Sequence, residues 1–150
     1  MPSPFTVNQL THNDSEVFAR LVNLFHVVFE NEDTTVAPLE HLQRLLRDPH
    51  FAVFVVLFET HVVGGCTAYV LPSYTSTNPE LLIYDLAIHP DFQRRGLGAL
   101  LIQSVGTYCT NQHIPLFFAL AHADDEPAVE FYRATGAHLE SVMNALYPIP

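Results

Sequence analysis

Two apolar runs separated by a very short connection constrain the fold of this chain most strongly. Residues 51–58 are almost continuously apolar and rich in β-branched and aromatic side chains, and residues 62–71 have the same character. Such runs are typical of strands at the centre of a sheet. Because only residues 59–61 connect them, we expect an antiparallel hairpin. Because these strands are apolar on both sides, we expect helices to cover both faces of the sheet.

Two amphipathic helices are predicted before the hairpin. Asn13 and Glu16 have the spacing of a capping box, and apolar residues at steps of three and four then predict a helix of about four turns. Pro38 suits the first turn of a second helix. Residues 5–10 alternate like a short edge strand. The predicted buried residues of the two helices are Val17, Leu21, Leu24, Phe25 and Val28, then Leu39, Leu42, Leu45 and Leu46.

After the hairpin, strand and helix patterns alternate. Residues 72–79, rich in Ser, Thr, Asn and Pro, predict a surface loop, and Gly136 is placed to close the last helix in the left-handed conformation. We therefore expect an α/β fold of the mixed α+β type, a sheet of about six to seven strands with four helices, in one domain over residues 1–150. The later elements are strands at 81–88 and 116–121, helices at 97–108 and 127–135, and one or two closing strands within 138–147.

The charge of the chain limits its partners. There are 16 acidic residues against 6 basic ones, a formal charge of −10, and every basic residue is an arginine. Such a charge repels nucleic acids and anionic membranes, so we expect neither as a partner. It favours a cationic substrate, although net charge also simply keeps a protein soluble. The 49% of hydrophobic residues excludes disorder.

The cysteines, the histidines and the first ten residues exclude several classes of protein. Cys66 and Cys109 are too few for a disulfide framework or a zinc cluster, and we expect both to be buried. No HxxxH or HExxH pair occurs, and only His113 and His122 are loosely grouped, so we expect no metal. We expect a soluble, cytoplasmic protein, because the first ten residues lack a basic segment followed by an apolar one. No uncharged apolar stretch of about 18 residues occurs either.

A glycine-rich junction carries the chemistry. The strand at 81–88 leads through the turn HPDF and the run QRRGLG into a helix. Gly96 and Gly98 leave the backbone accessible, and a helix start offers unpaired N–H groups to an anion. Arg94 and Arg95 are the only basic residues between Arg47 and Arg133. This combination predicts a phosphorylated ligand.

Other phosphate motifs fit less well. A P-loop needs a lysine, which the chain lacks. A dinucleotide-binding fingerprint has three glycines in the first strand-helix unit, whereas here the glycines come late in the chain and the third is missing. Taken alone, GxG after a strand is more often just a turn.

Two motifs resemble the GCN5-related N-acetyltransferase (GNAT) superfamily. QRRGLG matches its (Q/R)xxGx(G/A) motif at the start of the third helix, and Ala128, Phe131 and Tyr132 match AxxFY on the next helix. The superfamily resemblance covers roughly residues 5–147. The segments TAYVLP, IYDLAI and DDEPAVEFYRATG, within residues 65–136, are similar to the aminoglycoside 3-N-acetyltransferases of that superfamily.

The resemblance implies a GNAT fold and direct transfer of an acetyl group from acetyl-coenzyme A to the 3-amino group of an aminoglycoside, which would confer antibiotic resistance. It implies no metal or other cofactor, and a homodimer. Backbone N–H groups from Arg94 to Ala99 would hold the pyrophosphate, and the end of the preceding strand would pair with the pantetheine. The implied coenzyme-binding residues are Leu86, Ala87, Ile88, Gln93, Arg94, Arg95, Gly96, Leu97, Gly98 and Ala99.

Two residues are candidates for proton transfer. An ammonium group must lose a proton before it attacks, and Asp85 is the carboxylate placed to accept it. Its simpler explanation, a partner for a buried backbone group, is less favoured because an acid in mid-strand is costly to bury. The resemblance implies that Tyr132 protonates the departing thiolate, whereas spacing alone is equally typical of a tyrosine packed on the core.

Acidic residues are predicted to border the acceptor site. Asp125 suits the N-cap of the last helix, and it stands where many relatives have Asn. Together these acids would focus a negative potential suited to a polyamine sugar. Two alternatives stay open: a small polyamine or protein amine as acceptor, and a non-catalytic module that binds acyl-coenzyme A. The candidate substrate-binding acids are Glu30, Glu32, Asp33, Glu80, Asp85, Asp124 and Asp125.

Overall fold

The computed structural model describes residues 3–150 and contains two compact units. One unit ends at Ala119, and the other is Leu120–Pro150. No helix in residues 3–150 is both long and apolar enough to cross a membrane.

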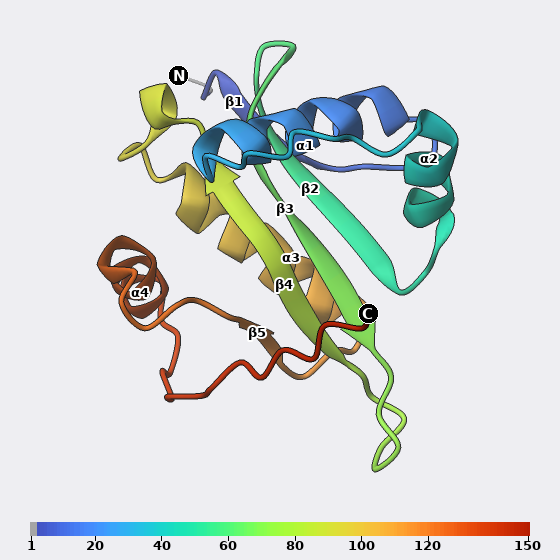
Figure 1. Ribbon diagram of the computed structural model, residues 1–150, viewed down its shortest axis with the longest axis vertical. Coiled ribbons are helices and arrows are strands. Elements are labelled where there is room, and N and C mark those ends of the chain that lie inside the picture. Colours follow the sequence, from blue (N-terminus) through green and yellow to red (C-terminus); the bar gives the residue numbers. More distant parts are fainter. Residues whose placement is uncertain (1–2) are drawn as a thin grey trace. The chain divides into compact units, whose positions relative to one another are not determined.

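A mixed sheet forms the centre of the first unit (Figure 1). It has five strands in the order β1-β2-β3-β4-β5. Neighbours are antiparallel except β4 and β5, which are parallel. The hairpin predicted at the centre is confirmed as β2 and β3. The strands are β1 (Phe5–Gln9), β2 (Phe51–Phe58), β3 (His61–Leu71), β4 (Glu80–Ile88) and β5 (Phe117–Ala119).

Helices cover both faces of this sheet. Helices α1 (Ser15–Val28) and α2 (Leu39–Arg47) lie on one face, and α3 (Leu97–Asn111) lies on the other (Figure 1). A short 3-10 helix, η1 (Pro90–Phe92), connects β4 to α3. Each face has its own apolar cluster, so the sheet is buried on both sides as its continuous apolar strands predicted.

Both cysteines lie in the core, as predicted. Burial raises the pKa of the Cys66 thiol to about 12 and that of Cys109 to about 11. Since the thiolate is the reactive form, neither cysteine is a nucleophile near neutral pH.

Some helix details differ from the sequence predictions. The N-cap of α1 is Asp14, not Asn13, and the Asp14 carboxylate accepts a hydrogen bond of 2.7 Å from the Thr11 amide, upstream of the helix. Pro38 is the N-cap of α2 and does not lie in its first turn. Leu39 is 45% exposed, because it begins α2 ahead of the turn that packs on the sheet through Leu42.

The second unit contains α4 (Glu126–Ala134), closed by Gly136 at a positive φ of 99°, as predicted. The closing strands predicted within residues 138–147 are wrong, since residues 137–150 form no strand or helix. The predicted sheet of six to seven strands is therefore reduced to five within the described residues. Alternating apolar residues form a strand only where a neighbouring strand edge pairs with their backbone groups, and within residues 3–150 no strand pairs with this segment.

Candidate active site

A β-bulge in β4 decides which way Asp85 faces. Thr67 pairs with Asp85 but Ala68 pairs with Ile83, so Tyr84 is an extra residue in β4. Leu81 and Ile83 pack on the α3 face, whereas Ala87 packs on the α1 face. An unbroken strand would place residues 81, 83, 85 and 87 on a single face. The bulge therefore moves Asp85 from the α3 face of the sheet to the α1 face.

The Asp85 carboxylate is half-buried and has no ion-pair partner among residues 3–150. The backbone amide of Asp85 donates a hydrogen bond of 3.3 Å to the Thr67 hydroxyl. Burial raises the pKa of the Asp85 carboxyl above its ordinary value. A carboxylate whose pKa is raised accepts a proton more readily, which is the property a general base requires.

The two parallel strands part at the bulge. Strand β5 pairs with β4 only through Leu81, Leu82 and Ile83. From Tyr84 to Ile88, the edge of β4 turned away from β3 has no strand partner in the part of the chain that the structure describes. Unpaired backbone groups on such an edge can receive an extended ligand as an added strand. This stretch includes the predicted coenzyme-binding residues Leu86, Ala87 and Ile88.

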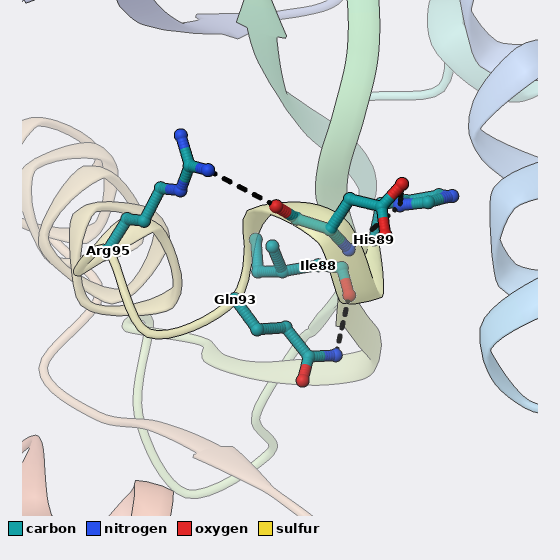
Figure 2. A network of polar contacts seen from close by, with 5 residues as sticks. Ile88, His89, Gln93 and Arg95 are labelled. Atoms are coloured by element: carbon teal, nitrogen blue, oxygen red, sulfur yellow. Dashed lines mark hydrogen bonds and ion pairs between the residues drawn. The ribbon is translucent and has the colours of Figure 1, made fainter.

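Side chains in the turn after β4 form hydrogen bonds with the backbone of the same turn (Figure 2). The Gln93 side-chain amide donates to the Ile88 carbonyl at 2.9 Å, and the His89 Nδ1 accepts from the Asp91 amide at 3.1 Å. The Arg95 guanidinium donates to the Asp91 carbonyl at 3.4 Å and lies 5.3 Å from the centre of the Phe92 ring. Gln93 and Arg95 therefore hold the shape of the turn.

The glycine-rich run produces the helix start that its sequence predicts. Gly96 is the N-cap of α3 at a φ of 78°, in the left-handed region, and no side chain caps the helix there. Arg94 also has a positive φ, 63°, and its side chain forms no ion pair within residues 3–150. An uncapped helix start beside an exposed arginine can bind an anion. Leu97 is buried, while Gly98 and Ala99 follow in the same first turn.

The acidic loop after α1 is held in place by His26. The His26 Nε2 lies 2.8 Å from the Thr35 carbonyl, and its Nδ1 lies 3.0 Å from the Asn31 side-chain nitrogen. Glu30 has a positive φ of 54°, and Glu30 and Glu32 are exposed. The Asp33 carboxylate accepts hydrogen bonds from the Thr35 hydroxyl and amide, which lower the pKa of Asp33. These hydrogen bonds therefore fix the conformation of the loop that carries Glu30, Glu32 and Asp33.

Glu80 is separated from Asp85 within the same unit. It is the first residue of β4, opposite Leu71, five positions before Asp85. At about 3.3 Å per residue, the two lie about 16 Å apart along the strand. The structure does not bring Glu80 to the bulge.

The second unit carries the remaining predicted site residues. The Asp125 side chain accepts from the Ala128 amide at 3.2 Å, so its predicted N-cap role is confirmed. Asp124 precedes it and is exposed. Tyr132 lies on α4, with its ring centre 5.1 Å from that of Phe131.

Three residues beside Asp85 were missed by sequence reasoning: Thr67, Tyr69 and Tyr84. The rings of Tyr69 and Tyr84 meet edge to face, with their centres 5.6 Å apart. Burial, Tyr84 and then Asp85 raise the pKa of the Tyr69 hydroxyl. For Tyr84, the available signal was its position directly before an acid in mid-strand. Thr67 and Tyr69 become neighbours of Asp85 only through the register of β3 and β4, which the sequence does not show.

Among residues 3–150, no group of three or more His, Cys, Asp or Glu side chains is placed to hold a metal ion.

Residues 18–137 match the acetyltransferase (GNAT) family. The chain belongs to this family, and the mixed five-stranded sheet and four α-helices found in residues 3–150 are a GNAT fold. The superfamily resemblance of the two motifs is therefore confirmed. GNAT acetyltransferases use acetyl-coenzyme A.

Solved structures of aminoglycoside acetyltransferases are similar to this chain over nearly its whole length. One, from an uncultured soil metagenomic sample and in complex with sisomicin, is 37% identical, with a TM-score of 0.95 and 97% of each chain covered. A second from such a sample is 26% identical, with a TM-score of 0.92, covering 97% of this chain and 99% of that one.

A curated relative is an N-acetyltransferase that acts on an alanine of ribosomal protein bS18 in Salmonella typhimurium. It is 26% identical over 69 residues, 46% of this chain and 47% of the relative. The match therefore spans about half the length of that protein.

Proposed function

We propose that this protein transfers the acetyl group of acetyl-coenzyme A to the 3-amino group of an aminoglycoside. One observation supports the aminoglycoside: the similarity over nearly the whole of both chains to an enzyme crystallised with sisomicin. The 3-amino position rests on TAYVLP, IYDLAI and DDEPAVEFYRATG, which resemble the 3-N-acetyltransferase branch. Such an activity would confer resistance to the antibiotic.

The coenzyme binds along β4 and at the start of α3. Its pyrophosphate accepts hydrogen bonds from the backbone amides between Arg94 and Ala99, and Arg94 adds a positive charge. Its pantetheine pairs with Leu86, Ala87 and Ile88. The uncapped start at Gly96 and the strand edge that β5 leaves unpaired support this placement.

Two residues move protons in the reaction. The Asp85 carboxylate accepts a proton from the acceptor's ammonium group, so that the nitrogen lone pair can attack the acetyl carbonyl carbon. The bound thioester supplies the acetyl group and a thiolate leaving group. Tyr132 donates its hydroxyl proton to the thiolate sulfur as the carbon–sulfur bond breaks. The second nitrogen proton is released to water, which leaves an amide and a thiol.

Acidic residues attract the polycationic acceptor. Glu30, Glu32 and Asp33 line the loop that His26 holds, and Asp124 and Asp125 precede α4. Each of these acidic groups raises the local concentration of a cation near it, and this attraction is screened by salt. Glu80, the first residue of β4 and five positions before Asp85, contributes only to the long-range field.

A protein or peptide amine is the second candidate acceptor. The curated relative, which modifies an alanine of a ribosomal protein, is the observation that favours it.

The decisive experiment measures coenzyme A release from acetyl-coenzyme A with a panel of amines. The panel contains sisomicin, gentamicin, spermidine and a peptide with an N-terminal alanine, and NMR locates the acetylated nitrogen. We expect turnover of the aminoglycosides, with acetylation at the 3-amino group. A strong preference for spermidine or the peptide would contradict the aminoglycoside, and acetylation elsewhere would contradict the regiochemistry. Coenzyme binding without turnover of any amine would identify a non-catalytic module.

A further inference from the structure

We propose that Tyr69 and Tyr84 form the aromatic wall of an ammonium subsite whose anionic side is Asp85. The subsite takes a protonated amine, and its identification with an aminoglycoside amine rests on the proposed function. The inference follows from three features of the bulge in β4, namely the ring geometry, the unpaired carboxylate and the exposure of the two rings.

The two rings are held in a defined arrangement. Tyr69 and Tyr84 meet edge to face at 84°, with their centres 5.6 Å apart. Tyr69 is also anchored on the sheet by Phe51, whose ring centre is 5.0 Å away. Phe51 belongs to the apolar cluster under α1 and α2, so this aromatic row lies on the face toward which the bulge directs Asp85.

The bulge leaves Tyr84 unpaired and exposed. As the extra residue of β4, it pairs with no residue of β3. Tyr84 is 62% exposed, and Tyr69 is 38% exposed. Large aromatic side chains gain free energy by burial, so an exposed pair next to a carboxylate indicates a surface that a ligand covers.

The carboxylate lacks a cation in the protein itself. Asp85 is half-buried, and no Arg or His forms an ion pair with it within residues 3–150. A partly desolvated carboxylate is stabilised by an opposite charge. A positive charge on the ligand would meet the Asp85 oxygens and the electron-rich faces of the rings together, which is how aromatic residues recognise ammonium groups.

The experiment is calorimetric titration of sisomicin into the full chain, in the presence of coenzyme A, with Tyr84→Leu, Tyr84→Phe and Tyr74→Leu variants. Tyr84→Leu removes an exposed ring, and Tyr84→Phe restores the ring without the hydroxyl. Tyr74, fully exposed in the loop between β3 and β4, is the matched control. Kd is read directly, so the result does not depend on turnover.

We expect Tyr84→Leu to raise Kd about fivefold, while Tyr84→Phe and Tyr74→Leu bind like the unaltered protein. Equal Kd values for Tyr84→Leu and the unaltered protein would overturn the subsite, as would the absence of sisomicin binding to the unaltered protein. Acetyl transfer measured in parallel separates the two proposals. Weakened binding by Tyr84→Leu in a protein that acetylates no aminoglycoside supports the subsite and contradicts the proposed function.

Discussion

Thr67 and Asp85 face each other across β3 and β4 at the position where the register shifts, and the Asp85 amide donates a hydrogen bond of 3.3 Å to the Thr67 hydroxyl. One residue further along, Ala68 pairs with Ile83. The pair therefore marks the end of the bulge, where the side chains of β4 change faces. The face of the sheet that Asp85 occupies depends on this junction.

Removing the charge of Asp85 should impair acetyl transfer. In Asp85→Asn the side chain keeps its size but cannot accept the ammonium proton. We expect kcat/KM for aminoglycosides to fall about 100-fold or more, the usual contribution of a positioned general base. Steady-state kinetics across a range of pH measures this loss. An unchanged kcat/KM at every pH would remove Asp85 from proton transfer.

The same variant should be more stable than the unaltered protein near neutral pH. Burial raises the pKa of the Asp85 carboxyl, so the folded state binds this proton at higher pH than the unfolded chain does. The contribution of Asp85 to stability is complete below its unfolded pKa and is lost as the pH rises through its folded pKa. Asp85→Asn cannot ionise and escapes this loss.

Thermal unfolding at several pH values tests the direction of this pH dependence. The Tm advantage of Asp85→Asn should shrink as the pH falls below the ordinary range of an aspartate. An advantage that stayed constant with pH would show that ionisation of Asp85 does not cause it.

Tyr132→Phe should separate turnover from coenzyme binding. The substitution removes the hydroxyl that donates a proton to the thiolate and keeps the ring that lies 5.1 Å from Phe131. We expect kcat to fall by about 100-fold, with little change in the Kd of coenzyme A. Equal losses in kcat and in coenzyme affinity would indicate a packing role for Tyr132.

Gly65 should tolerate no side chain, because α1 packs directly on it. A Cβ at Gly65 would lie 2.6 Å from Leu21 Cδ1 and 2.5 Å from the Phe54 carbonyl oxygen. We expect Gly65→Ala to lower the free energy of unfolding by about 1–3 kcal/mol. Gly106→Ala is the control, since a Cβ there meets Phe117 at an ordinary 3.8 Å within α3.

Urea unfolding distinguishes the two alanine variants. Gly106→Ala should gain up to about 1 kcal/mol from helix propensity. If Gly65→Ala were as stable as Gly106→Ala, the spacing of α1 from the sheet would not depend on this glycine.

Gly96 should matter for coenzyme binding as well as for folding. Its φ of 78° is unfavourable for alanine, although a Cβ would meet no atom within 4 Å. Gly136, at a φ of 99°, also has a positive φ and no atom within 4 Å of an added Cβ, and it closes α4. We expect each alanine substitution to cost about 1 kcal/mol of stability. Only Gly96→Ala should raise the Kd of coenzyme A, measured by calorimetry, and equal Kd values in both variants would argue against the placement of the pyrophosphate.

The sequence by itself determined the elements whose signals are local. The hairpin at residues 51–71, the left-handed Gly136 and the N-cap at Asp125 all follow from periodicity and from the conformational preferences of single residues. The glycine-rich turn at Gly96 was predicted in the same way. These features depend on a few consecutive residues, so the pattern is sufficient to locate them.

Only the tertiary structure decided the face that Asp85 occupies. The alternation of β4 taken alone would place Asp85 with Leu81 and Ile83 on the α3 face, and the one-residue shift of register against β3 reverses it. The unpaired state of residues 138–147 was decided in the same way. Strand register and strand partners depend on hydrogen bonds between segments that are distant in sequence, and no local pattern records them.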